Sequence, residues 1–204
     1  MLDFAILGLL HESPMHGYAL RKQLAAKLGM IRAAISYGSL YPALRRLQSA
    51  GFITESRPDS DDASSHDQSS HGVGKRARII YTITAEGKER FQELLAEAGP
   101  EAFNDAAFDV RFAFFARTDR QIRLRILEGR RRRVEERRES LRQMLGRSSE
   151  WLDAYTQELQ RHGLEACNRE ARWLEDLITA ERAGLTPGQT SSESRSVESG
   201  NFEK

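Results

Sequence analysis

The stretch SYGSLYPALRRLQSAGFI, residues 36–53, decides the fold of this chain of 204 residues. Leu40, Leu44 and Leu47 recur at the spacing of one helical face, and Gly51 stands where a helix commonly ends. A proline near the start of the stretch is tolerated in the first turn of a helix. The spacing therefore predicts a short amphipathic helix over residues 38–50.

The outward face of that helix has the side chains expected of a DNA-reading helix. With the leucines inward, Pro42, Arg45 and Ser49 point outward, Arg46 lies on one flank and Tyr41 on the other. The small residues at its start allow that end to approach a major groove closely. Free backbone N–H groups then face phosphate, and tyrosine and arginine side chains can reach base edges.

The flanking segments complete a recognisable order of elements. Residues 3–11 and 16–28 each predict a helix from their apolar spacing. Residues 52–56 (FITES) and 78–84 (RIIYTIT) predict two strands, and Thr84 is placed to cap a fourth helix. Three helices, a strand pair and another helix indicate a winged helix-turn-helix domain over residues 1–98.

Basic residues are concentrated where such a domain meets DNA. The second strand begins with GKRAR, residues 74–78, at the base of the predicted wing. The whole chain has a net charge of only +1, but four of the eight acids in residues 1–87 lie between 58 and 73, against ten basic residues overall. The candidate DNA contacts are Ser36, Tyr37, Ser39, Tyr41, Pro42, Arg45, Arg46, Lys75, Arg76 and Arg78.

The predicted wing has a long tip, residues 58–74, which is rich in Ser, Asp and Gly and has almost nothing to bury. We expect a flexible insertion that costs little. Three interpretations stay open: an inert spacer, an acidic competitor of DNA for Lys75 and Arg76, or a phosphorylated form of that competitor. His66, Asp67 and His71 lack the further ligand and the frame that a metal site needs, so we expect no metal.

Gly99-Pro100 marks a domain boundary, and residues 99–183 read as helices throughout. A long charged helix is predicted from about residue 119 to 146, followed by separate helices over 149–162 and 164–183. Residues 184–204 are predicted to be disordered. The apolar residues of the long helix recur every seven positions and predict a dimer seam. The candidate dimerisation residues are Leu127, Val134, Leu141, Leu145, Trp173 and Leu177.

Two further features of this half have alternative interpretations. The arginine run 130–133 is either a solvated face, given the neighbouring acids, or a second DNA contact. The aromatic residues after the boundary are either core or the lining of a pocket for a small-molecule effector, an aromatic compound or a nucleotide. The candidate effector-binding residues are Phe108, Arg111, Phe112, Phe115, Trp151 and Tyr155.

Several classes of function are excluded by the sequence. It contains no nucleophile–base pair, no phosphate-binding glycine loop and no plausible metal set, so we expect neither an enzyme nor a bound cofactor. Cys167 is the only cysteine, which excludes an intrachain disulfide. The apolar run near the start is too short to span a bilayer and follows no basic leader. We therefore expect a cytoplasmic, nucleoid-associated protein without membrane contact.

Three motifs together resemble the PadR family of bacterial transcriptional regulators: LGLLHESPMHGYAL (7–20), GSLYPALRRLQSAGFI (38–53) and RIIYTITAEGKE (78–89). The resemblance extends over residues 1–95, apart from the longer wing. It implies a homodimer that represses at inverted-repeat operators on double-stranded DNA, with a recognition helix at 38–50 and a wing strand at 75–84. It also implies an effector, since some PadR-like regulators respond to phenolic compounds.

The motif around His16 leaves two roles open for its neighbour. His16 is placed to cap the second helix, and Tyr18 either packs in the core or touches the DNA backbone. The alternative to a DNA-binding regulator is a protein-interaction adaptor that acts through the winged helix and the long charged helix. The basic face of Arg45, Arg46 and the wing strand favours the regulator, because an adaptor has no need of it.

Overall fold

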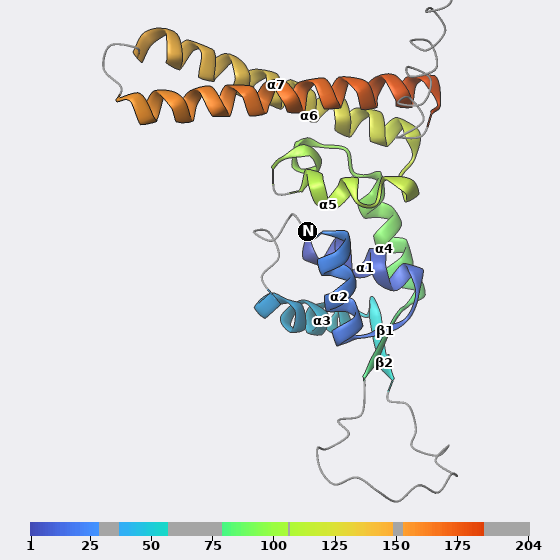
Figure 1. The fold of residues 1–204 in the computed structure, drawn as a ribbon. Helices are drawn as coiled ribbons and strands as arrows, with labels where there is room; N and C mark the ends of the chain where they lie inside the picture. The colour runs from blue at the N-terminus through green and yellow to red at the C-terminus, as the bar shows by residue number, and fades with distance from the viewer. Residues whose placement is uncertain (29–36, 57–78, 106, 149–152, 186–204) are drawn as a thin grey trace, which may run out of the picture. The chain divides into compact units, whose positions relative to one another are not determined.

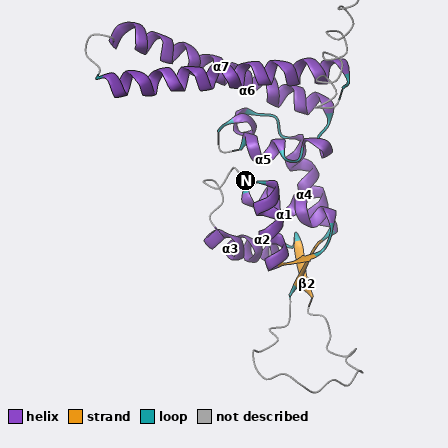
Figure 2. Cartoon of the chain, viewed as in Figure 1, coloured by secondary structure: helices purple, strands orange, loops and turns teal. Residues whose placement is uncertain are grey.

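Helices dominate the computed structural model, which describes residues 1–28, 37–56, 79–105, 107–148 and 153–185 (Figures 1 and 2). The chain divides into two compact units. The first comprises Met1–Glu97 and Asp109–Arg117, and the second comprises Ala98–Phe108 and Thr118–Lys204. Several candidate residues lie outside the described parts: Ser36, Lys75, Arg76, Arg78, Trp151, and the histidines and aspartate of the wing tip.

Helix α1, Leu2–Glu12, is the centre of the first unit. All seven residues from Phe4 to Leu10 are buried, because α1 packs against three helices and a strand: α2 (Gly17–Lys27), α3 (Leu40–Ser49), α4 (Ala85–Ala96) and β3 (Ile80–Ile83). A helix that is apolar on all sides is stable only when it is enclosed. The apolar run at the start of the chain is therefore the core of the winged domain.

The helix-turn-helix consists of α2, Gly17–Lys27, and α3, Leu40–Ser49, the latter preceded by a 3-10 turn, Tyr37–Ser39. Gly51 follows α3 with a φ of 77°, a left-handed conformation that favours glycine. The N–H of Gly51 donates to the carbonyl of Gln48, and that of Phe52 donates to the carbonyl of Leu47. This confirms the helix end predicted at Gly51.

The sheet has three antiparallel strands in the order β1-β3-β2, with bounds Met15–His16, Ile80–Ile83 and Ile53–Ser56. The register of the wing strands runs from Ile53 opposite Ile83 to Ser56 opposite Ile80. The sequence predicted only these two strands. The two-residue strand β1 is too short to show an alternating pattern, and its pairing with β3 ties the entrance of α2 to the wing.

Helix α4, Ala85–Ala96, begins at the predicted cap: the Thr84 hydroxyl accepts a hydrogen bond from the N–H of Gly87 at 3.0 Å. After Glu97 the chain leaves the first unit and returns to it for residues 109–117, which we had assigned to the second domain. Phe114 explains the return, because its ring packs edge-on against Phe4 and Phe91 with centroids 5.2 and 6.0 Å away.

The second unit is built on a pair of long antiparallel helices, α6 (Arg120–Ser148) and α7 (Ala154–Ala183), which lie side by side in Figure 1. A 3-10 turn, Pro100–Phe103, packs on α6, where the Phe103 ring covers Gly129. Residues joining the units form the short helix α5, Phe108–Phe112, and the 3-10 turn Phe115–Arg117.

The prediction of two helices over 149–162 and 164–183 is wrong, because α7 is continuous from Ala154 to Ala183. Gly163 does not break it. A Cβ at this glycine would lie 3.5 Å from Leu141 of α6, so packing against the neighbouring helix offsets the roughly 1 kcal/mol cost of an interior glycine. The helix ends instead at Gly184, whose φ is 74°.

Among the described residues no helix is long and apolar enough to cross a membrane. Within the same ranges, histidine, cysteine, aspartate and glutamate side chains form no group of three or more that could hold a metal ion.

Candidate nucleic-acid interface

Helix α3 buries one face and exposes the other as the wheel predicts. Leu40, Ala43, Leu44 and Leu47 are buried in the core of the first unit. On the opposite face, Tyr41 retains 56% of its surface, and Arg45, Arg46 and Ser49 are exposed. Pro42 and Ser39 are half-buried at the start of the helix. The outward face therefore consists of a tyrosine, two arginines and a serine.

Tyr41 packs on the start of α2. A Cβ at Gly17 would lie 3.5 Å from the ring and hydroxyl of Tyr41, so the tyrosine lies directly over this glycine. His16 caps α2 as predicted: its Nδ1 accepts a hydrogen bond from the N–H of Ala19 at 3.0 Å. The entrance of α2 and the outward face of α3 thus form one continuous surface.

The structure excludes one of the two roles considered for Tyr18, and its contact with the DNA backbone stays a prediction. This side chain is 70% exposed, which excludes core packing, and its ring stacks on that of His16 at 6.3 Å. Arg21 and Lys22, one turn further along α2, are also exposed. The sequence analysis did not single out these two residues, although two adjacent basic residues on a helix preceding a recognition helix are a usable signal.

Tyr81 of β3 connects the sheet to this surface. Burial, together with the nearby Glu55 carboxylate, raises the pKa of the Tyr81 phenol, while the charge of Arg45 acts in the opposite direction. The phenol is therefore neutral over the physiological range.

Arg46, unlike Arg45, has an ion-pair partner among the residues that the structure describes. Its guanidinium donates to the Asp3 carboxylate of α1 at 2.9 Å. The wing candidates Lys75, Arg76 and Arg78 lie outside the described residues, and Tyr37 is described only as part of a 3-10 turn. The structure therefore brings together Ser39, directly before α3, and Tyr41, Pro42 and Arg45 of the helix itself.

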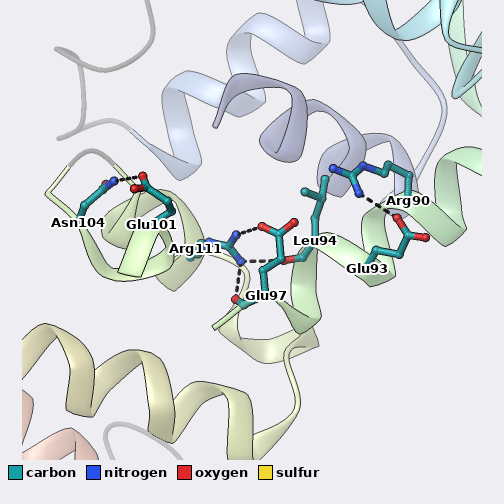
Figure 3. A network of polar contacts seen from close by, with 7 residues as sticks. All are labelled: Arg90, Glu93, Leu94, Glu97, Glu101, Asn104 and Arg111. Atoms are coloured by element: carbon teal, nitrogen blue, oxygen red, sulfur yellow. Dashed lines mark hydrogen bonds and ion pairs between the residues drawn. The ribbon is translucent and has the colours of Figure 1, made fainter. Parts of the chain in front are cut away.

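The candidate effector residues do not gather at one place within either unit. Arg111 is 3% exposed and is engaged at the end of α4: it donates to the carbonyls of Leu94 (2.7 Å) and Glu97 (3.1 Å) and to the Glu97 carboxylate (2.8 Å) (Figure 3). These bonds hold the carbonyls that a helix end leaves without partners. Arg111 thus has a structural role, which the sequence did not reveal.

The aromatic candidates are divided between the units. In the first unit, the rings of Phe112 and Phe115 pack 4.9 Å apart. In the second, Phe108 is buried and meets the ring of Trp173 edge-on at 6.2 Å. Tyr155, near the start of α7, is 90% exposed. Effector binding by these residues stays a prediction.

The predicted dimer seam needs correction. Leu127 and Val134 are 1% and 2% exposed, since α7 of the same chain covers this side of α6. Leu177 is also buried, while Leu141 and Leu145 are half-buried. A seven-residue apolar repeat on one long helix indicates that something packs there, but it does not distinguish a partner chain from the next helix of its own chain.

The four arginines of the run 130–133 differ in their contacts. Arg130 is buried, donates to Glu170 at 2.7 Å and pairs with Asp105, and Arg131 pairs with Glu175. These two arginines join α6 to its neighbours and are not a DNA surface. Arg132 and Arg133 are exposed, as expected of a solvated face.

Comparison with known proteins shows what the domain that carries this surface is similar to. Residues 6–93, which run from within α1 to within α4 and include the sheet, match the model of the transcriptional regulator PadR-like family. The N-terminal domain of this chain is therefore similar to that of the PadR-like family. Members of this family are regulators of transcription and not enzymes.

One curated relative and three solved structures are similar to this chain. The negative transcriptional regulator PadR of Bacillus subtilis (strain 168) is 28% identical over 100 residues, 49% of this chain and 48% of the relative, so the chain spans about half the length of the curated relative it matches. The solved structures are Bacillus subtilis PadR with operator DNA (21% identical, 88% of this chain and 98% of that one, TM-score 0.39), Bacillus subtilis PadR with p-coumaric acid (22%, 89% and 98%, TM-score 0.38), and smu.1604c from Streptococcus mutans UA159 (24%, 87% and 98%, TM-score 0.40).

Proposed function

We propose that this PadR-like protein is a DNA-binding transcriptional regulator. It binds a palindromic operator as a homodimer at the nucleoid, represses transcription there and responds to a small-molecule effector. The observation that carries the proposal is the outward face of α3, where Tyr41, Arg45 and Ser49 are exposed while the opposite face is buried in the winged domain.

The spacing of these three residues suits base reading. They stand four positions apart, so their side chains lie one above another along the helix. The major groove of B-DNA is about 12 Å wide and admits one helix. In that position the Arg45 guanidinium can donate two hydrogen bonds to a guanine, and the Tyr41 hydroxyl can reach a neighbouring base edge or phosphate.

The exposed residues of α2 support a second, sequence-independent set of contacts. In helix-turn-helix proteins the first helix of the motif crosses the phosphate backbone. Tyr18 and Lys22 are exposed on this helix. Phosphate contacts of this kind fix the register of the recognition helix and make affinity fall with salt.

Repression is supported by the curated relative, whose name describes a negative transcriptional regulator. A protein bound over a promoter excludes polymerase without further chemistry. This mode fits a chain whose family consists of regulators.

Homodimerisation is supported by apolar surface that α7 leaves uncovered. Tyr155, Leu159 and Trp173 are 90%, 69% and 41% exposed. Residues 155, 159, 166 and 173 are all exposed and recur at intervals of four or seven on one side of α7, a spacing typical of a helix that packs along a second helix. This surface replaces the Leu127–Val134 seam in our proposal. A dimer would place two α3 helices roughly 34 Å apart, as a palindrome requires.

The effector part of the proposal rests on the aromatic residues of the second unit. The half-exposed Trp173 packs on Phe108, and the Arg130 guanidinium lies 5.2 Å from the centre of the Phe108 ring. Flat aromatic compounds bind well to such aromatic surfaces. A change in the dimer caused by a ligand would alter the distance between recognition helices and release the operator.

Fluorescence anisotropy tests the DNA-binding part directly. The purified full chain is titrated into labelled duplexes of its own upstream region and of scrambled sequence, at a low and a higher salt concentration. We expect tighter binding to the upstream duplex at both salt concentrations, with both affinities reduced by salt. Equal, weak binding to both duplexes, together with no preferred site after selection from random DNA, would instead favour the protein-interaction adaptor.

A further inference from the structure

The adjacent residues Arg45 and Arg46 of α3 have different surroundings. Arg46 contacts an acidic residue of another helix. Arg46 is in the last turn of α3 and Asp3 is in the first turn of α1, 43 residues earlier. One guanidinium nitrogen of Arg46 donates to Asp3 Oδ1 at 2.9 Å. Arg45 is exposed and forms no ion pair within the part of the chain that the structure describes.

The pair is held in place by the core beneath it. Phe4 and Leu47 directly follow Asp3 and Arg46 in the chain, and they are 2% and 4% exposed. Both backbone positions are therefore fixed by packing between α1 and α3. The charged ends remain accessible, since 60% of the Arg46 side chain and 42% of the Asp3 side chain are exposed to solvent. The contact is thus preorganised and open to competition by another anion.

We infer that Asp3 is an internal competitor of DNA phosphate for Arg46, and that it lowers the affinity of the α3 surface for DNA of any sequence. The inference rests on the proposed function, because it concerns the regulation of the same surface. A carboxylate and a phosphate oxygen are equivalent acceptors for a guanidinium. When Arg46 moves to a phosphate, its bond to Asp3 is lost, and this loss offsets part of the gain from the new contact.

This arrangement favours discrimination between sequences. Arg46 lies on the flank of α3, so a phosphate is its natural partner on DNA and such contacts carry no sequence information. Holding Arg46 on Asp3 reduces binding to all DNA alike. Recognition then depends more strongly on Arg45 and Tyr41, which face the groove.

The test uses Asp3→Asn, which keeps the shape of the side chain and removes its charge, and a random-sequence DNA duplex as the probe. An exposed ion pair is worth little, so we expect tighter binding by a factor on the order of two to five at low salt. The slope of log affinity against log salt should become steeper by about one ion, because Arg46 no longer exchanges one anion for another.

Two matched variants test whether the gain in DNA affinity is specific to the Asp3–Arg46 pair. Glu86→Gln removes an exposed acid from the first turn of α4, with the same change in net charge and the same helix position, and should leave the affinity unchanged. In an Arg46→Gln background, Asp3→Asn should have no effect on DNA binding. Thermal melts of all variants verify that each is folded.

The outcomes separate this inference from the proposed function. A wild type that binds DNA while Asp3→Asn binds equally or more weakly overturns the role of Asp3 and leaves the proposed function intact. A gain that persists without Arg46, or that Glu86→Gln reproduces, also overturns it, since the effect would then be one of net charge. A wild type that binds no DNA overturns the proposed function and this inference together.

Discussion

Phe114 lies so close to Gly8 that a Cβ at position 8 would stand 2.3 Å from Cε1 of its ring. The contact joins α1, the central helix of the winged domain, to a residue more than a hundred positions later. A ring packed on backbone at this distance needs glycine for a steric reason, independent of backbone conformation.

Gly8→Ala should therefore destabilise the first unit by about 1–3 kcal/mol, the usual cost of overpacking a core. The measurement is urea denaturation followed by circular dichroism. Gly99→Ala is the matched control, because a Cβ there meets nothing within 4 Å. In a Phe114→Ala background the cost of Gly8→Ala should largely disappear. An unchanged midpoint for Gly8→Ala alone would contradict the packing described for Phe114.

Arg111→Ala should destabilise the first unit by about 2 kcal/mol, because two carbonyls at the end of α4 and the Glu97 carboxylate lose their donor. Arg90→Ala is the control: its ion pair with Glu93 is exposed and should be worth less than about 1 kcal/mol. Denaturation of both variants measures the difference. If Arg111→Ala were as stable as Arg90→Ala, the guanidinium would be free for an effector, as the sequence first suggested.

Asp105 should make the second unit sensitive to acid. Burial raises the pKa of this carboxyl, but hydrogen bonds from Arg137 and Arg130 and their charges outweigh burial and hold the pKa below its ordinary value. A pKa lowered by folding contributes stability that is present above the unfolded value and is lost as pH falls through the folded value. Because half of the side chain is exposed, solvent screening limits the contribution to less than about 1 kcal/mol.

The measurement is the stability difference between the wild type and Asp105→Asn as a function of pH, followed by tryptophan fluorescence, since both tryptophans belong to the second unit. We expect the difference to be largest near neutral pH and to shrink as pH falls below the ordinary carboxyl range. A difference that is constant across that range would show that the charge of Asp105 is not what matters.

Measuring the oligomeric state tests whether the exposed side chains of α7, and not the buried side chains of α6, form the dimer interface. Tyr155→Ser with Leu159→Ser should give monomers with an unchanged unfolding midpoint at high dilution, because both side chains are exposed within one chain. Leu127→Ala should instead cost about 2–5 kcal/mol in folding, as expected of a buried leucine. Sedimentation equilibrium and denaturation distinguish the two effects. Dimers that survive loss of Tyr155 and Leu159 would place the interface elsewhere.

Local patterns in the sequence were sufficient to predict the order of the helices and the two wing strands in the winged domain. The buried face of α3, the end of that helix at Gly51 and the Thr84 cap of α4 all follow from residues within a few positions of one another. Each depends on helix periodicity or on a turn conformation, which neighbouring residues determine. For this reason the order of elements and the outward face of α3 could be predicted.

Contacts between distant residues could not be predicted in the same way. The pairing of β1 with β3, the position of Phe114 on Gly8 and the bonds of Arg111 to the end of α4 each join segments far apart in the chain. The apolar repeat of Leu127 and Val134 indicated that something packs on this side of α6. These residues are buried within the chain, where α6 packs against α7. Periodicity alone cannot distinguish such a neighbouring helix from a partner chain. The missed strand and the misassigned seam share this cause.

The most direct test of the central claim, that α3 reads DNA through its outward face, is the binding of Arg45→Ala to an operator and to scrambled DNA. We predict a loss of about 1–3 kcal/mol on the operator and little change on scrambled DNA, so that specificity falls. Lys88→Ala, which removes an exposed positive charge from α4, serves as the control and should preserve specificity. Operator affinity unchanged in Arg45→Ala, or lost equally on both DNAs, would contradict base reading by this helix.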